Sequence, residues 1–244
     1  MPRSRSQPRD ALSKDRIEEV ALALVEQVGL EGFSTRKLAT ELGCEAMSIY
    51  HYYPSKAHLL DALFDRLIGG LPADQLTLSW RERLDRTVFA YRGMAHRNPR
   101  FFPYIALHRH NTAVGLAWLE RMLTIFRDAG LDSEQTARFF RVIGYYVIGA
   151  LIDETSGYAK GHSAADPVPD SVAADAYPNV AAVNPWFKPS EHEATFRLGL
   201  DALVDRVEAV AAGGGQGEGP LPAEGLRPLR PASLRARSSR SSSR

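Results

Sequence analysis

The sequence is poor in cysteine, because Cys44 is the only one among 244 residues. A single thiol cannot form an internal disulfide, so a cross-linked secreted scaffold is excluded and a reducing compartment, the cytoplasm, is expected. No apolar run approaches the roughly 18 residues that a membrane-spanning helix needs. Residues 1–10 are polar and arginine-bearing with no apolar stretch after them. We therefore expect no secretory signal and no membrane partner.

Charge of either sign is in little excess, since 30 Lys and Arg residues stand against 29 Asp and Glu, for a formal net charge of +1. Residues 1–60 contain eight of each kind and sum to zero. Binding to a polyanion would therefore depend on where the charges lie and not on their total. The sequence also lacks a nucleophile–base pair, an HExxH motif, a P-loop and a dinucleotide fingerprint. We expect no enzyme, no catalytic residue and no cofactor.

Apolar residues recur at helical spacing along most of the chain, which predicts an all-α fold. Over residues 33–60 the pattern is two short helices joined by a tight turn and followed by the start of a third. Ser34 or Thr35 can cap the first helix, and Gly43 follows its last apolar residue, where a left-handed conformation is required. Ser55 can cap the third helix. These features together predict a helix-turn-helix.

The run from Thr35 to Leu60 reads T-R-K-L-A-x-x-L-G-x-x-x-x-S-I-Y-x-Y-Y-x-x-K-x-x-L-L. These spacings resemble the DNA-binding domain of the tetracycline-repressor (TetR) family of bacterial regulators. The resemblance implies that the second helix reads a major groove and that Lys56 contacts a phosphate. From position and side-chain chemistry we expect DNA contacts at Thr35, Arg36, Ala46, Met47, Ser48, Tyr50, His51 and Lys56. Met47 is equally compatible with the small core of the motif, where Ile49 is expected.

The rest of the pattern divides the chain into five segments. They are a disordered basic tail (residues 1–12), a helix-turn-helix DNA-binding domain (13–60), a connecting helix and turn (61–73), a helical ligand-binding and dimerisation domain (74–212), and a disordered Arg/Ser-rich tail (213–244). Ser79-x-x-Glu82 and Ser190-x-x-Glu193 are expected to be capping boxes. Val28 and Leu116 are expected on the inner faces of their helices. Residues 159–189 are expected to be a connection with little periodicity.

The C-terminal half also resembles the ligand-binding branch of the tetracycline repressor itself. The resemblance rests on a long helix containing G-A-L-I-D-E, a loose insert, and F-R-L-G-L-D-A-L near the end. It implies a homodimer built from a four-helix bundle, with an ordinary monomeric core as the alternative. Pro103 occupies the position nearest to the family's magnesium-binding histidine, and Asp153 alone is not a metal site. We therefore expect no metal site and an effector other than a tetracycline–magnesium chelate.

Aromatic and polar side chains among inward-facing residues are the candidates for an effector pocket. They are Phe102, Tyr104, His108, Trp118, Met122, Phe140, Tyr145 and Asp153. Core packing is the alternative for each aromatic residue, because most aromatics of a helical domain belong to its core. The His108-x-His110 spacing places the two imidazoles on different faces of a helix, so we do not expect them to hold a metal.

The sequence thus predicts an all-α, two-domain, homodimeric transcriptional regulator in the cytoplasm, and specifically a repressor. It would bind a pseudo-palindromic double-stranded DNA operator and be released by a small-molecule effector of unknown identity. The alternative is an effector-independent DNA-binding or architectural protein that uses the same reading helices. Equal affinity for operator and random DNA would favour that alternative.

Overall fold

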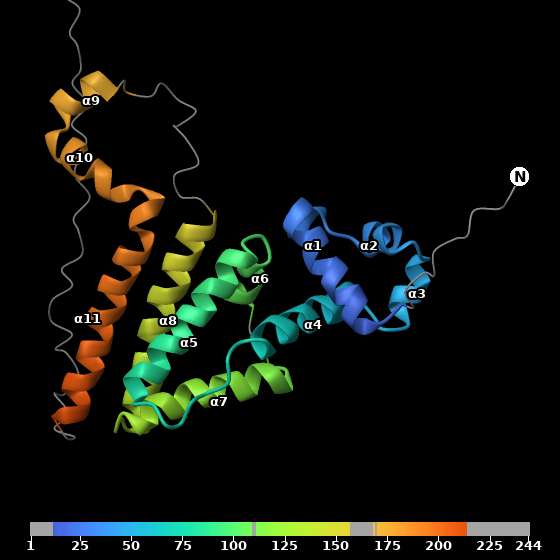
Figure 1. The fold of residues 1–244 in the computed structure, drawn as a ribbon, viewed down its shortest axis with the longest axis horizontal. Helices are drawn as coiled ribbons and strands as arrows, with labels where there is room; N and C mark the ends of the chain where they lie inside the picture. The colour runs from blue at the N-terminus through green and yellow to red at the C-terminus, as the bar shows by residue number, and fades with distance from the viewer. Residues whose placement is uncertain (1–11, 109–110, 157–167, 169, 214–244) are drawn as a thin grey trace, which may run out of the picture.

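A computed structural model describes residues 12–108, 111–156, 168 and 170–213 (Figure 1). This part of the chain is helical and contains no strand, which confirms the predicted all-α class. The expected tails at residues 1–12 and 213–244 lie almost entirely outside it. The helices of the described part are α1 (Lys14–Gly32), α2 (Thr35–Leu42), α3 (Ala46–Tyr50), α4 (Lys56–Gly69), α5 (Trp80–Arg97), α6 (Phe102–Leu107), α7 (Ala113–Asp128), α8 (Ser133–Ser156), α9 (Asp170–Ala176), α10 (Pro178–Val183) and α11 (His192–Ala212).

Helices α1, α2 and α3 form a small head at one end of the molecule, and α4 connects the head to the larger helical body (Figure 1). Ser34, rather than Thr35, caps α2, since its Oγ accepts from the Lys37 N–H at 3.3 Å. Gly43 ends α2 in the left-handed conformation, with φ 65°. A side chain at that backbone angle would be strained, so glycine makes the turn between α2 and α3.

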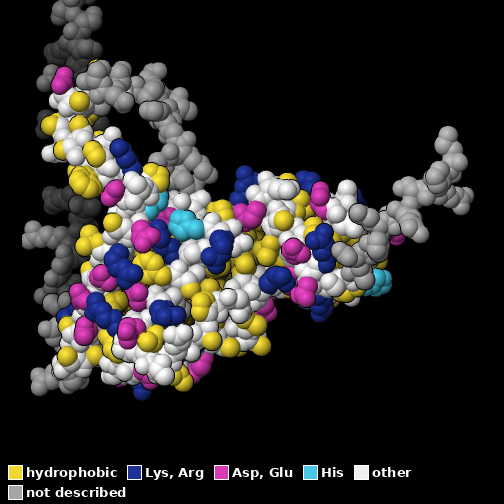
Figure 2. All heavy atoms as spheres, viewed as in Figure 1, with side chains coloured by type: hydrophobic (Ala, Val, Ile, Leu, Met, Phe, Trp, Pro, Cys, Tyr) yellow, Lys and Arg dark blue, Asp and Glu magenta, His cyan; other side chains and the backbone are white. Residues whose placement is uncertain are grey.

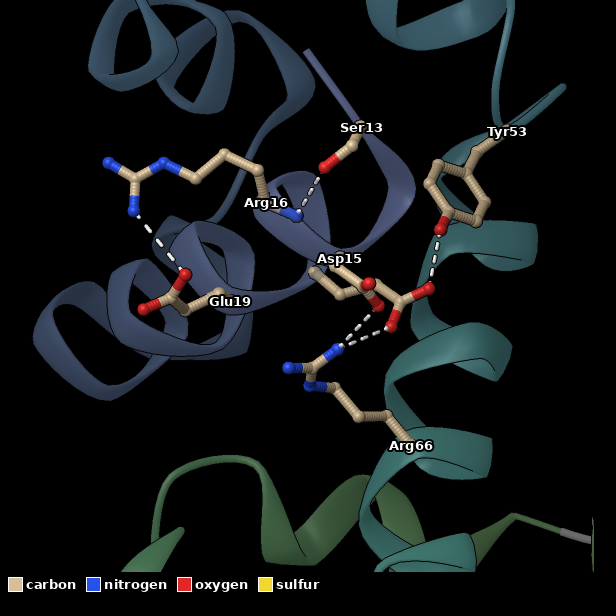
Figure 3. Close-up of polar contacts among 7 residues, drawn as sticks. Ser13, Asp15, Arg16, Glu19, Tyr53 and Arg66 are labelled. Atoms are coloured by element: carbon tan, nitrogen blue, oxygen red, sulfur yellow. Dashed lines mark hydrogen bonds and ion pairs between the residues drawn. The ribbon is translucent and has the colours of Figure 1, made fainter. Parts of the chain in front are cut away.

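A polar network fastens α4 to α1. The Tyr53 hydroxyl donates to Glu18 Oε1 at 2.5 Å, and the Arg66 guanidinium donates to Glu18 and Asp15, both at 3.2 Å. Figure 3 shows Arg66 reaching from α4 toward the two α1 carboxylates, with Tyr53 on the far side of one of them. Burial, followed by the hydrogen bond to Glu18, raises the pKa of Tyr53, so the phenol stays protonated and continues to donate. The head is thus tied to the segment before α4 through Tyr53 and to the last turn of α4 through Arg66.

The larger body packs α5, α7, α8 and α11 around an aromatic core (Figure 1). The predicted capping box opens α5: Ser79 Oγ accepts from the Glu82 N–H, and Glu82 Oε2 accepts from the Ser79 N–H. Both contacts satisfy backbone donors that the first turn of a helix leaves without a partner. The largest fully buried side chains of the body include Phe101, Phe102, Phe126 and Phe196.

Arg83 is a buried cation within this body. Its guanidinium forms a two-pronged contact with Asp74, at 2.9 and 2.6 Å, and a third bond of 2.6 Å with Asp128. The hydrogen bond from Arg83 lowers the pKa of Asp74, so the carboxyl stays ionised. Removing one member of such a buried pair leaves an uncompensated charge. The contact therefore holds the turn after α4 against α5 and the end of α7.

The second predicted capping box is wrong. Residues Pro189–Glu191 form a short 3-10 turn, and α11 begins directly after it without a side-chain cap. The Ser190 hydroxyl donates to its neighbour Glu191 at 3.3 Å instead of accepting from a helix N–H. Pro189 fixes its own φ and precedes the expected cap, which favours the tight turn over an extended N-cap residue.

Two apolar residues expected on inner faces lie outward. Val28 is exposed because α1 breaks at the next residue, Gly29, which has φ 75° and ψ 168°. Leu116 is also exposed, since the inner face of α7 is formed by Gly115, Met122, Ile125 and Phe126. In both helices the apolar stripe is narrower than the sequence pattern suggests.

The segment expected to be a connection with little periodicity contains helices α9 and α10 in its second half, followed by a 3-10 turn at Asn184–Phe187. Helices α9 and α10 project from the body above α11, and hydrophobic side chains gather on their surface (Figures 1 and 2). The exposed apolar side chains of this projecting arm include Val172, Tyr177, Val180, Val183, Trp186 and Phe187. No helix of the described residues is long and apolar enough to cross a membrane.

Candidate nucleic-acid interface and effector cavity

The outer face of α3 presents small, flexible and polar side chains to solvent. Ile49 is fully buried beneath the helix, as predicted, whereas Met47 is 64% exposed. Ala46 and Ser48 are half-buried on either side of Met47. Of the two interpretations of Met47, the structure therefore supports the outward one. A thioether and a methyl group on this face suit contact with a thymine methyl, and the Ser48 hydroxyl can donate to a base or a phosphate.

The start of α2 and the end of α3 meet at a polar contact. Thr35 Oγ1 and the Tyr50 hydroxyl lie 3.0 Å apart and form a hydrogen bond. Arg36 is exposed next to Thr35 and forms no ion pair with any described residue. His51 is exposed immediately after α3. This arrangement places an uncompensated cation, two hydroxyls and an imidazole close to the reading helix, the groups that position a protein on phosphates.

Lys56 lies at the first position of α4 but points inward. Its ammonium donates to the backbone oxygens of Phe33, at 2.8 Å, and Leu30, at 3.2 Å, and lies 5.3 Å from the centre of the Phe33 ring. Lys56 therefore braces the connection between α1 and α2. An ammonium has three N–H donors, so the two carbonyls leave one for a phosphate. The phosphate contact of Lys56 stays a prediction.

A cavity of about 370 Å³ lies inside the C-terminal body. Residues of α5, α6, α7 and α8 form its walls, and Phe64 and Ile68 near the end of α4 close one side. Its volume is within the range of about 300–1,000 Å³ that is usual for small-molecule sites. Since α4 starts at the head and ends at the cavity, one helix contacts both sites.

Five of the eight predicted pocket residues line this cavity: His108, Trp118, Met122, Phe140 and Tyr145. The other three do not line it. Phe102 and Tyr104 are buried in the core on α6, where the Tyr104 ring stacks on the His108 imidazole at 4.1 Å. Asp153 is exposed near the end of α8. His110 lies outside the described residues, and the described residues contain no group of three or more metal-ligating side chains.

Sequence reasoning missed Tyr91, which lines the cavity from α5. Its spacing with Leu84 and Val88 marks it as an ordinary core residue, and all three are indeed buried. Nothing in a helical repeat distinguishes a residue that only packs on its neighbours from one that also lines a cavity.

Helix α6, which contributes Ile105 and Ala106 to the cavity wall, is hydrogen-bonded directly to the head. Glu26 of α1 accepts from the backbone N–H of Arg100, at 3.1 Å, and of Phe101, at 3.0 Å, immediately before α6. The Arg100 guanidinium also donates to a backbone oxygen of α1. A carboxylate at this position complements the positive end of a helix and satisfies N–H groups that have no partner within it.

Two further hydrogen bonds join the cavity walls to α4. The Tyr104 hydroxyl donates to Asp61 at 2.9 Å, and the Thr112 hydroxyl, which also caps α7, donates to Asp65 at 2.5 Å. Burial, followed by the hydrogen bond to Asp61, raises the pKa of Tyr104 to about 12. The phenol is therefore protonated at neutral pH and available as a donor. A displacement of α6 or α7 by a bound molecule would act on α1 and α4 through these contacts.

A helix-turn-helix head connected to a body with an internal cavity defines the class of one-component DNA-binding regulators. The family described as bacterial regulatory proteins, tetR family, matches residues 17–63, and the tetracyclin repressor-like C-terminal domain matches residues 71–211. The chain belongs to the TetR family of bacterial transcriptional regulators. It is a DNA-binding regulator with a ligand-binding domain of the tetracycline-repressor type, and members of this family are not enzymes.

The chain is similar in sequence to a known repressor and shares its fold with proteins solved with a ligand or with DNA. The chain is 29% identical to the HTH-type transcriptional repressor DrrR1 of Streptomyces coeruleorubidus, over 84% of this chain and 80% of that protein. It shares its fold with Streptomyces coelicolor ActR in complex with actinorhodin, at a TM-score of 0.63, 22% identity and coverage of 82% and 99%. It also shares its fold with BioQ on its double-stranded DNA operator, at a TM-score of 0.56, 21% identity and coverage of 82% and 99%.

Proposed function

We propose that the protein is a repressor that binds a pseudo-palindromic operator as a homodimer and leaves it when a small molecule occupies the cavity. The observation that carries this proposal is the set of hydrogen bonds by which α6 and α7, at the cavity, contact α1 and α4, at the DNA-binding head. Operator binding implies action at the chromosome, in the cytoplasm.

On the DNA side, α3 enters the major groove, and Ala46, Met47 and Ser48 contact base edges. Arg36 contacts phosphate beside Thr35 and Tyr50, whose mutual hydrogen bond joins α2 to α3. His51 and the remaining donor of Lys56 add contacts to the backbone. Net charge contributes little, so the fit depends on this one face of the head.

The dimer would form on the exposed side of α8 and α11, which pack together through the Tyr146 hydroxyl and the Phe196 backbone oxygen at 2.8 Å. Val142 on α8 and Leu198 on α11 are large apolar side chains exposed in the single chain, Leu198 by 73%. A partner that covers them removes apolar surface from water. Pairing two such helices from each subunit gives the four-helix bundle typical of the family.

The effector acts by binding the operator-free arrangement more tightly than the operator-bound one, since otherwise it shifts no equilibrium. Occupation of the cavity moves α6, and the contacts of α6 with α1 and α4 change the separation of the two heads. DNA presents its half-sites at fixed intervals of about 34–36 Å, so a changed separation lowers affinity for the operator without altering α3 itself.

The test compares binding of the dimer to a selected operator and to random DNA at several salt concentrations. We expect Arg36→Ala to weaken binding to both DNAs and to reduce the slope of log affinity against log salt by about two, because each subunit of the dimer loses one phosphate contact. We expect Met47→Ala to weaken operator binding alone, with an unchanged slope. Arg86→Ala, which removes an exposed arginine on α5, away from the head and from the proposed dimer surface, is the matched control. Equal affinity of the unmodified protein for both DNAs would favour an effector-independent DNA-binding protein.

A further inference from the structure

The entry of the chain into α1 is fastened to the segment that follows the reading helix. Tyr52 lies two residues beyond the end of α3, and its hydroxyl donates to the Leu12 backbone oxygen at 2.7 Å, 40 residues away in the chain. The Leu12 side chain is half-buried and packs against the hydrophobic core. Residue 12 is therefore held beside the end of α3 through both its backbone and its side chain.

The next two residues fix the direction from which the chain enters α1. Ser13 caps the helix, since its Oγ accepts from the Arg16 N–H at 3.2 Å, and its backbone is extended, with φ −135° and ψ 161° (Figure 3). The Lys14 ammonium lies 5.8 Å from the centre of the Tyr53 ring. Two consecutive tyrosines after α3 thus contact the chain on either side of Ser13. The residues that precede Leu12 therefore join the head at a fixed point next to α3.

These preceding residues carry an excess of positive charge. Residues 1–11, here called the N-terminal segment, contain Arg3, Arg5 and Arg9 against a single carboxylate, Asp10. Arginine side chains bind phosphates, and they also enter minor grooves that are narrow, where the negative potential of DNA is strongest. A·T-rich stretches have such grooves. The segment therefore has the side chains that suit a minor groove.

The length of the N-terminal segment matches the distance that such a contact requires. A chain spans at most about 3.3–3.6 Å per residue, so Arg5 can lie up to roughly 25 Å from Leu12 and Arg3 up to roughly 30 Å. The minor groove that flanks a major-groove site is about half a helical turn away, roughly 17 Å. Both arginines can span that distance. Because Tyr52 holds the start of the segment beside α3, the arginines have a raised effective concentration at the flanking groove.

We propose that Arg3 and Arg5 bind the minor groove that flanks each half-site, and that Tyr52 is the positioning residue that starts the N-terminal segment beside α3. The partner is an A·T-rich stretch of double-stranded DNA outside the bases that α3 reads. This assignment rests on the proposed function, since it adds a contact to the same operator. Contact with phosphates alone is the main alternative, because arginine also binds DNA through charge without regard to sequence.

The experiment uses two DNA duplexes that share the footprinted pseudo-palindrome and differ only in the flanking base pairs. The flanks are A·T-rich in one duplex and G·C-rich in the other. Affinity of the full chain for each duplex is measured by fluorescence anisotropy at fixed, near-physiological salt. The flank ratio is the affinity for the A·T-flanked duplex divided by that for the G·C-flanked one. We expect a flank ratio of about five or more, the lower end of the effect of changing one recognised base pair.

The arginines are tested by a double variant. Arg3→Ala, Arg5→Ala should bring the flank ratio to about one, because the groove contact is lost while α3 still reads the shared pseudo-palindrome. The double variant Ser4→Ala, Ser6→Ala changes the same segment without changing its charge and is the matched control. Its flank ratio should equal that of the unmodified protein.

The role of Tyr52 is tested by combining variants. Tyr52→Phe keeps the ring and removes the hydroxyl that holds Leu12, so the flank ratio should fall toward one. In the Arg3→Ala, Arg5→Ala background the same change should leave the flank ratio unaltered. A purely structural role of the hydroxyl would weaken both duplexes equally and leave the ratio unchanged in either background. Tyr177→Phe, at an exposed tyrosine before α10, is the matched control.

The outcomes separate this assignment from the proposed function. A flank ratio near one in the unmodified protein, or one that survives the arginine double variant, would overturn the groove contact. An equal loss of affinity for both duplexes in that variant would assign the arginines to phosphates instead. An unchanged flank ratio in Tyr52→Phe would overturn the positioning role. Specific binding of the pseudo-palindrome without a flank preference leaves the regulator standing, whereas equal affinity for the pseudo-palindrome and random DNA overturns both.

Discussion

Replacing Glu26 with alanine should loosen the contact between the DNA-binding head and the cavity wall without unfolding either. The Glu26 carboxylate accepts the backbone N–H groups of Arg100 and Phe101, which lie 74 and 75 residues away in the chain and immediately precede α6. Alanine removes both acceptors and leaves the backbone of α1 unchanged. The Arg100 N–H then has only water as a partner, whereas the Phe101 N–H keeps its bond of 3.1 Å to the Asn98 backbone oxygen.

The size of the effect follows from the two lost bonds. A hydrogen bond to a charged group contributes about 1.5–3 kcal/mol when buried. Glu26 is half-buried, and one of its two bonds is exposed, so solvent screening reduces the pair together to about 1–2 kcal/mol. This corresponds to a factor of about 5–30 in the population of the opened contact.

Native-state hydrogen exchange measures that population directly. In Glu26→Ala, the amide of Arg100 should exchange about 5–30 times faster. The amide of Phe101, which keeps its bond to the Asn98 backbone oxygen, should accelerate less, and the centres of α5 and α8 should not change. Glu31→Ala removes an exposed carboxylate of the same helix and should leave exchange at both amides unchanged.

The functional counterpart is the ratio of operator affinities with and without a compound bound in the cavity. In Glu26→Ala that ratio should move toward one. Because the coupling between two binding sites is reciprocal, the operator should then change the affinity for the compound by the same reduced factor. Unchanged exchange at Arg100 and Phe101, or an unchanged ratio beside accelerated exchange, would refute the role of Glu26 in coupling.

Two further predictions concern the body of the molecule. A methyl group at Gly199 would overlap the Tyr146 ring, so Gly199→Ala should destabilise the fold by about 1–3 kcal/mol and lower Tm by several degrees. Gly93→Ala is the control and should not lower Tm, because a methyl group there meets only the flexible end of an arginine side chain. Tyr104 has a pKa raised to about 12, so its contribution to stability is complete below pH 10 and is lost as pH rises through 12. The difference in urea midpoint between the unmodified protein and Tyr104→Phe, which keeps the ring but not the bond to Asp61, should therefore fall over that interval and stay constant between pH 7 and 9.

The helix-turn-helix could be predicted from the sequence because its determinants are local. Ser34 and Ser55 cap helices within three residues of themselves, and Gly43 is required by its own backbone angle. Ile49 falls on the buried side because a five-residue helix has only one inner face. The cap at Ser190 failed for an equally local reason, the preceding proline, which the pattern of serine and glutamate does not include.

The contacts between the two parts of the chain could not be predicted in the same way. Glu26 looks like any solvated acidic residue on an amphipathic helix, and its partners are backbone groups far along the chain. Asp153 has the polarity of a pocket residue, but the direction in which α8 turns its end exposes it. Helical periodicity predicts which side of a helix is buried, but it does not predict whether that side lines a cavity. The cavity therefore emerged only from the packing of four helices against α4.

The central claim is that two copies of this chain read a two-fold-symmetric operator through α3, and a footprint on the DNA flanking its own gene tests it most directly. At fixed, near-physiological salt, the account predicts a protected pseudo-palindrome whose half-sites lie about one helical turn, or a multiple of it, apart. Protection should disappear in the double variant Arg36→Ala, Met47→Ala. Continuous protection without a two-fold centre, or a symmetric footprint that survives the double variant, would contradict the account.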